Sequence, residues 1–169
     1  MSSDVVNETA ILEEVRAAVA GVEDPEMQPI TVGELGMLVE VSVDGPTAVV
    51  DIMPTFTGCP ATAYIGADVE QAAVAVEGID RAVVRWRRDL SWGPERITEA
   101  GRIKLAETGI APPGSGQTQQ NSLLGIGGVR CPYCGSRNTR ADSPFGSAPC
   151  RSTHSCRDCK TPFDAIKPI

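Results

Sequence analysis

The chain has 169 residues, of which 41% are hydrophobic and 22% are charged. These proportions are typical of a folded globular protein and exclude wholesale disorder. No apolar stretch approaches the roughly 18 residues that would cross a membrane. The first residues, MSSDVVNE, contain no basic segment followed by an apolar run, so no secretory signal is predicted. We therefore expect a cytoplasmic protein.

Charge and cysteine are both unevenly distributed along the chain. Residues 1–128 contain 8 basic and 19 acidic residues, whereas residues 129–169 contain 7 basic and 3 acidic ones, which gives the overall net charge of −7. Five of the six cysteines lie in the last 39 residues. This asymmetry predicts two domains, 1–110 and 129–169. The segment between them, 111–128, is rich in Gly, Pro and Gln, as linkers are.

The first domain begins with a predicted helix and a predicted hairpin. Apolar residues recur at helical spacing over residues 8–20, and Gly21 can end that helix. Val39, Val41 and Val43 then alternate with polar residues in a predicted strand over 38–43, and a second strand is predicted over 47–53. The Asp-Gly-Pro turn at 44–46 predicts that these two strands form an antiparallel hairpin.

A second helix, a third strand and a last helix should complete this domain. Helical spacing begins just after Pro60 and continues to Gly78, and residues 83–87 have the pattern of a strand. A short helix follows Thr98 and ends at Gly109. Helices on one face of a small sheet make an α+β fold, an α/β two-layer domain.

Cys59 lies where the hairpin passes into the second helix, in the segment Thr57-Gly58-Cys59-Pro60. Since Pro60 suits a first helical turn, Cys59 should stand at or beside the N-cap. There, unpaired backbone N–H groups and the helix dipole favour a thiolate, to which Thr57 could donate a hydrogen bond. Such a thiolate could attack an electrophile or bind a soft metal. Alternatively, Cys59 is a small buried hydrophobic residue, as most single cysteines are.

An acidic turn, Asp24-Pro25-Glu26, follows the first helix and precedes Leu35-Gly36. By itself it could be only a solvated turn. Residues 8–90 resemble the small iron–sulfur cluster assembly domain of Fe–S carrier and maturation proteins. The resemblance rests on five features in the same order: a helix, the acidic turn, the Leu-Gly pair, a valine-rich hairpin and the Cys-Pro turn. The resemblance implies that Cys59 transiently binds an Fe–S cluster or iron. It also implies that Asp24, Glu26 and Thr57 lie near that site.

Two Cys-x-x-Cys pairs stand 21 residues apart near the C-terminus: Cys131 with Cys134, and Cys156 with Cys159. This spacing is close to that of zinc-binding pairs. A disulfide framework would need an oxidising compartment, for which no export signal is predicted. Some 40 residues bury too little apolar surface to fold alone, so metal must supply folding free energy. We expect a zinc ribbon with structural zinc; a bound Fe–S cluster or mononuclear iron is the alternative.

Two further ligand-type residues, Cys150 and His154, lie just before the second pair. Either could substitute as a ligand, but we expect Cys150 to be a non-ligand and His154 to be packed on the ribbon or exposed. Because His154 is the only histidine and belongs to the other domain, a Cys–His nucleophile with Cys59 is not favoured.

Three further segments resemble the D-subunit family of bacterial 1,2-phenylacetyl-CoA epoxidases: GIAPP at 109–113, FGS at 145–147 and KTPF at 160–163. This family belongs to aerobic phenylacetate degradation. The resemblance implies other epoxidase subunits, a di-iron oxygenase or a reductase, as partners. If two chains share a cluster, it also implies a homodimer or larger assembly.

Catalysis by this chain alone is not expected. The sequence has no Glu-x-x-His pair for a di-iron centre and no Gly-x-Gly-x-x-Gly loop for a dinucleotide. The interpretation we favour is an accessory or maturation role in which Cys59 holds iron or an Fe–S cluster. The alternatives are an interaction module that recruits oxygenase subunits and, less favoured because of the net negative charge, a ribbon that binds nucleic acid.

Overall fold

The structure is a computed structural model that describes residues 2–112 and 129–167. Its backbone contacts divide the chain into two compact units, Met1–Ser91 and Trp92–Ile169, and each unit is described by itself. None of the described helices is both long and apolar enough to span a membrane.

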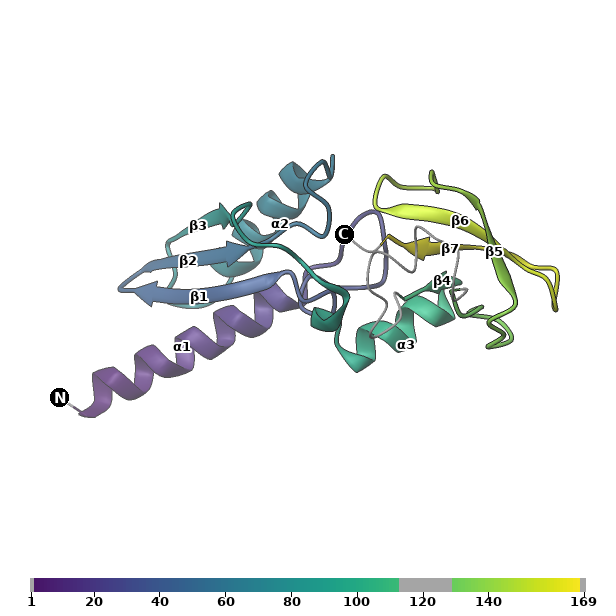
Figure 1. Cartoon of the computed structure of the whole chain (residues 1–169). Helices are drawn as coiled ribbons and strands as arrows, with labels where there is room; N and C mark the ends of the chain where they lie inside the picture. Colours follow the sequence, from purple (N-terminus) through teal and green to yellow (C-terminus); the bar gives the residue numbers. More distant parts are fainter. Residues whose placement is uncertain (1, 113–128, 168–169) are drawn as a thin grey trace. The chain divides into compact units, whose positions relative to one another are not determined.

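The first unit contains two helices and a three-stranded sheet (Figure 1). Its elements are α1 (Ser2–Ala20), β1 (Leu38–Asp44), β2 (Thr47–Ile52), α2 (Thr62–Val74) and β3 (Arg81–Trp86). The strand order is β1-β2-β3, with β1 antiparallel and β3 parallel to β2. The β2-α2-β3 connection therefore crosses over through a helix, as parallel neighbours require.

The core of this unit lies between one face of the sheet and the two helices. Helix α1 contacts β1, α2 contacts β3, and the two helices contact each other. Along β2, Ala48, Val50 and Ile52 are buried, whereas the alternate residues are partly exposed. Val15 of α1 and Ile65 of α2 are fully buried. The sheet is thus apolar on the helix side.

The predicted helices and strands of this unit are present, with shifted ends. Helix α1 begins at Ser2 rather than at residue 8. Helix α2 begins at Thr62 and ends at Val74, before the predicted end at Gly78. The early end has a local cause, because the N–H of Val76 donates to the carbonyl of Ala73, three residues back, which closes the helix in a tighter turn.

The second unit combines one helix with a four-stranded sheet in the order β4-β7-β6-β5. Its elements are η1 (Pro94–Arg96), α3 (Glu99–Glu107), β4 (Ile110–Ala111), β5 (Thr139–Ser143), β6 (Arg151–Cys156) and β7 (Pro162–Ile166). β4 is parallel to β7, and the other neighbours are antiparallel. The Thr98 hydroxyl caps α3 by accepting from the Gly101 N–H at 3.0 Å, in agreement with the predicted start of that helix.

A small apolar core holds the ribbon together. It contains Ala111, Cys131, Cys156, Phe163 and Ala165. Residue Ala111 comes from β4, so the segment just after α3 contributes to the same core as the cysteine loops. The chain is therefore of mixed α+β class with a small ribbon, as expected.

The contacts group α3 and β4 differently from the sequence analysis, which placed α3 and Ile110 in the first domain and Ala111 in the linker. Here the second unit begins at Trp92, and β4 pairs with β7. Of the predicted linker 111–128, residues 113–128 lie outside the described residues. The domain boundaries at residues 110 and 129 stay predictions.

Candidate functional site

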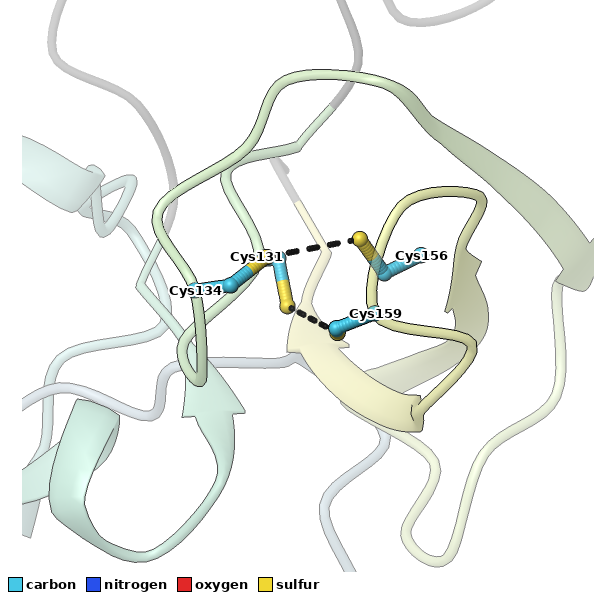
Figure 2. Close-up of side chains that lie close together, drawn as sticks. All are labelled: Cys131, Cys134, Cys156 and Cys159. Atoms are coloured by element: carbon cyan, nitrogen blue, oxygen red, sulfur yellow. Dashed lines mark hydrogen bonds between the residues drawn. The ribbon is translucent and has the colours of Figure 1, made fainter.

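Four cysteine side chains converge beside the ribbon sheet, and Figure 2 shows them facing one another from two loops. They are Cys131, Cys134, Cys156 and Cys159, and their sulfur atoms all lie within 4.8 Å of one another. In each pair the first cysteine is buried and the second is exposed. Each loop thus supplies one sulfur from the ribbon core and one from its surface.

The two loops have the same backbone geometry. The N–H of Gly135 donates to the carbonyl of Cys131 at 2.9 Å, and the N–H of Lys160 donates to the carbonyl of Cys156 at 3.1 Å. Gly135 and Lys160 both adopt left-handed backbone angles, with φ of 73° and 65°. Glycine takes this conformation without strain, whereas lysine does so at a cost. The second loop therefore keeps the turn despite its less suitable residue.

Backbone N–H groups also face the two exposed sulfurs. Hydrogen bonds from the hydroxyl and N–H of Thr161 lower the pKa of Cys159 to about 6. The Ser136 N–H lowers the pKa of Cys134, but burial and hydrogen bonds to the other sulfurs outweigh it and raise that pKa to about 12. Without metal, Cys159 is thus a thiolate at neutral pH and Cys134 a thiol, and a bound cation would displace the Cys134 proton.

A polar bridge joins the two loops outside the sulfur cluster. The Asp158 carboxylate accepts hydrogen bonds from the Ser136 hydroxyl and from the Asn138 side-chain amide, the latter at 2.7 Å. The N–H of Arg157 donates to the Asn138 carbonyl at 2.8 Å. These contacts fix the spacing of the loops, which suits the outer support that metal ligands require.

The sulfur spacing fits a tetrahedral zinc ion. Zinc–sulfur bonds of about 2.3 Å place tetrahedral thiolates about 3.8 Å apart. The Cys131–Cys159 and Cys134–Cys156 sulfur distances are 3.7 and 3.6 Å, far longer than a disulfide bond of about 2.05 Å. A tetrahedral set of four thiolates is a donor set for zinc or iron. Zinc bound there would act as a structural ion, since no position is left for a substrate.

Neither Cys150 nor His154 belongs to the converging group in the described part of the chain. Cys150 is buried, and its carbonyl accepts from the Lys167 N–H at 2.9 Å. The His154 ring stacks on Phe163 with centroids 5.6 Å apart, and its Nε2 lies 2.9 Å from the Ser152 hydroxyl. Burial lowers the pKa of His154. In this geometry both residues pack within the ribbon, and the four cysteines converge without them.

Cys59 is a half-buried residue in the turn between β2 and α2. It lies two residues before the N-cap, Ala61, so it stands beside the cap rather than at it. The backbone N–H groups of Ala61 and Thr62 donate to its sulfur. The Thr62 hydroxyl donates to the Cys59 carbonyl at 3.2 Å. Thr57 is exposed, and in the described residues no hydrogen bond joins its hydroxyl to the sulfur.

The prediction that this position favours a thiolate is wrong. Burial raises the pKa of the Cys59 thiol, and it outweighs the hydrogen bond from Ala61 that lowers it. The carboxylates of Asp24 and Glu26 raise the pKa further. The helix start acts in the predicted direction, but desolvation and two negative charges have a larger effect. The unloaded residue is therefore a thiol at neutral pH.

The acidic turn is built around a buried aspartate. Asp24 is 2% exposed, and its Oδ1 accepts from the Glu26 N–H at 2.8 Å, which is the geometry of an Asx turn. Glu26 is exposed. Both carboxylates act electrostatically on the Cys59 thiol from a segment more than 30 residues earlier in the sequence. Among the described residues, only the four ribbon cysteines converge closely enough to hold a metal ion, so the two carboxylates influence the thiol by charge.

Comparisons with known proteins match two separate stretches of the chain to two families. Residues 12–86 match the family described as iron-sulfur cluster assembly protein, and residues 114–167 match the PaaD zinc beta ribbon domain. A protein of Escherichia coli (strain K12), named as the putative D-subunit of 1,2-phenylacetyl-CoA epoxidase, is 34% identical over 156 residues, which are 92% of each chain. The chain belongs to this epoxidase D-subunit family. The family resemblance drawn from the sequence is therefore confirmed.

A solved structure supports the fold of the first unit in this family member. The crystal structure of a domain of unknown function, DUF59, from Bacillus anthracis is 25% identical, with a TM-score of 0.56. The matched region covers 60% of this chain and 96% of the Bacillus anthracis chain. The α+β arrangement that presents Cys59 is thus also found in a separate protein.

Proposed function

We propose that this chain is an accessory subunit that helps to assemble an iron or Fe–S centre for a phenylacetyl-CoA epoxidase in phenylacetate catabolism. In this proposal Cys59 is a transient ligand of the iron or cluster, which is cargo, and the four ribbon cysteines hold a structural zinc ion. The observation that carries the proposal is the half-buried Cys59 thiol, which is under the electrostatic influence of the Asp24 and Glu26 carboxylates. The iron-sulfur assembly family match over the same unit supports it.

The electrostatics of the Cys59 turn suit a site that loads and releases a cation. The carboxylates that disfavour the Cys59 thiolate attract a positive ion by the same charge interaction. Iron binding would displace the thiol proton, since metal ligation requires the thiolate. When the cargo leaves, the sulfur takes up a proton again and returns to its neutral form.

One sulfur cannot complete the ligand shell of an Fe–S cluster, which usually contains four cysteine thiolates. Cys59 is the only cysteine before residue 131. A cluster on this unit would therefore need ligands from a second chain or from the recipient protein. We propose a homodimer that shares the cluster, with transfer to an oxygenase or reductase subunit.

Anaerobic reconstitution tests the carrier role. The full chain and its Cys59→Ala and Cys150→Ala variants are incubated with ferrous iron and sulfide, and zinc and iron are counted per chain. Wild type and Cys150→Ala should take up iron, whereas Cys59→Ala should not, and zinc should stay at about one per chain in all three. Equal iron uptake by wild type and Cys59→Ala would contradict the proposal.

A second measurement separates this role from simple recruitment of oxygenase subunits. Cys59→Ser keeps the size of the side chain but removes the soft ligand. If the epoxidase assembles and turns over normally with Cys59→Ser, the chain acts as an interaction module rather than as an iron carrier.

A further inference from the structure

The three-stranded sheet of the first unit has a second face, opposite the one that packs on α1 and α2. Strand register assigns side chains to this open face, since they alternate with the buried residues of each strand. All of them are half-buried or exposed. β1 contributes Glu40, Ser42 and Asp44, β2 contributes Thr47, Val49 and Asp51, and β3 contributes Arg81, Val83 and Arg85.

The charges of the open face are separated by strand. The ionisable residues of β1 on this face, Glu40 and Asp44, are acidic, whereas those of β3, Arg81 and Arg85, are basic. β1 and β3 are the two edges of the sheet (Figure 1), so β2 keeps the acidic and the basic column about 10 Å apart. Among the described residues none of these four side chains forms an ion pair. The two columns therefore do not neutralise each other within one chain.

The middle of the open face is apolar or neutralised. Val49 of β2 lies in register with Val83 of β3. The Asp51 carboxylate accepts from the Arg87 guanidinium at 3.2 Å. With Arg87 included, three acidic and three basic side chains balance on this face, although residues 1–91 contain 16 acidic and only 5 basic residues. The open face is thus an electrically balanced surface on a strongly acidic unit.

This charge pattern is complementary to itself. Two sheets that pack face to face lie about 10 Å apart with nearly aligned strands, and a two-fold axis between them can run along the strands or across them. An axis along β2 places β1 of one chain opposite β3 of the other, so the acidic column meets the basic column twice. An axis across the strands places each column on its own copy, where like charges repel. The pattern favours the axis along the strands.

We propose that the open face is a dimer interface whose partner is a second copy of this chain, related by a two-fold axis along the strands. Glu40 and Arg85 both align with Asp51, so Glu40 would lie opposite the partner's Arg85. Asp44 and Arg81 both align with Thr47 and would meet in the same way. The valines fill the middle of the interface.

The same axis has a consequence for the Cys59 turn. A rotation about the strand direction leaves that direction unchanged, so β2 ends at the same end of the dimer in both chains. Cys59 lies in the turn that follows β2, and both Cys59 turns would extend from that end. This arrangement suits a cluster shared by two chains. Only this link to cluster sharing rests on the proposed function; the interface itself does not depend on it.

Sedimentation equilibrium of the zinc-loaded, iron-free full chain tests the interface, over a range of protein concentrations and at about 0.05 and 0.5 M salt. Glu40→Arg and Arg85→Glu each replace one charge of a proposed pair by its opposite. Glu70→Arg is the matched control, because Glu70 is an exposed residue of α2 and this substitution changes the net charge as Glu40→Arg does. Circular dichroism verifies that each variant is folded.

Wild type should dimerise with a Kd that rises with salt. Glu40→Arg and Arg85→Glu should each weaken the dimer at least about tenfold, because like charges then face each other twice. An equimolar mixture of these two variants should restore the dimer to within about threefold of wild type, since each substituted residue then faces the opposite charge in the partner. Glu70→Arg should change the Kd by less than about twofold.

A wild-type chain that stays monomeric at all concentrations would overturn the proposal, in favour of a different protein as the occupant of the open face. A dimer that both single variants leave unchanged would also overturn it, as would a mixture that dimerises no better than the single variants. Iron uptake by wild type and Cys59→Ala is a separate measurement. The failure of the interface and the failure of the carrier role are therefore distinguishable.

Discussion

The chemistry of Cys59 depends on its neighbours more than on its place in the sequence. Two backbone N–H groups stabilise its thiolate, but burial and the carboxylates of Asp24 and Glu26 have the larger, opposite effect. A single sulfur that stays protonated until a cation arrives is less exposed to oxidation than a free thiolate. This protonated resting state suits a site that binds its metal cargo only transiently.

Removing a carboxylate should therefore activate the thiol. Because the pKa of Cys59 is raised, its alkylation by iodoacetamide should be slow at pH 7.5 and rise towards alkaline pH. Glu26→Gln removes a negative charge, so the pKa should fall and alkylation at pH 7.5 should become several-fold faster. Mass spectrometry of the Cys59 peptide in zinc-loaded protein measures the rate against pH.

Glu14→Gln is the matched control for that experiment. Glu14 is an exposed carboxylate of α1 and is not among the groups that shift the Cys59 pKa. A pH profile of Cys59 alkylation that is the same in both variants would contradict the electrostatic account.

At the scale of elements, the acidic turn is held by a close approach between a loop and a helix end. The N–H of Gly33 donates to the Ala20 carbonyl at 3.0 Å. A Cβ at Gly33 would lie 2.7 Å from the Ala20 Cβ and 2.8 Å from its carbonyl oxygen. The segment from Gly21 to Leu35 can thus close only because residue 33 has no side chain.

Gly33→Ala should destabilise the first unit by about 1 to 3 kcal/mol, since the backbone must move to admit the methyl group. Gly21→Ala is the control, because its Cβ would meet ordinary contacts of 3.5 Å. Urea unfolding of the zinc-loaded chain compares the two variants. A smaller loss for Gly33→Ala than for Gly21→Ala would show that the loop adapts.

The sequence predicts elements well where one periodic pattern dominates. The valine alternation and the turn at Gly45 predict the β1–β2 hairpin, and Thr98 marks the start of α3. The strands β4 to β7 have no such signal: β4 has two residues and β5 reads TRADS. Their pairing depends on long-range contacts around the cysteines, which no local pattern contains.

The candidate sites were also predictable only where the signal was local in the sequence. Cysteine spacing predicts the convergence of the four sulfurs, because each pair is a local turn. The sign of the Cys59 pKa shift could not be predicted locally, since the burial that mainly raises it and the charges of Asp24 and Glu26 act on the thiol only in the folded unit.

At the scale of the whole molecule, the two compact units are stabilised by different interactions. The first has an extended apolar core between sheet and helices, whereas the described core of the ribbon includes two of the four converging cysteines, Cys131 and Cys156. Loss of metal would therefore remove part of the ribbon core as well as a cross-link.

Chelation should consequently unfold the ribbon and spare the first unit. In excess chelator, amide signals of residues 129–167 should collapse to unfolded positions, while those of β1, β2 and β3 stay dispersed. NMR of the full chain before and after zinc removal, and after zinc is restored, measures this. Simultaneous loss of both sets of signals would show that the units fold as one.

The unequal exposure of the sulfurs determines how an oxidant would attack the centre. Cys134 and Cys159 are exposed, and they come from different loops. Peroxide would take two electrons from this outer pair, release the zinc ion and form one disulfide between the loops. The damaged ribbon would remain covalently closed across the same gap that the metal spans, and a reductant with zinc would restore it. Peptide mapping after mild peroxide treatment should find the Cys134–Cys159 link before any within a loop.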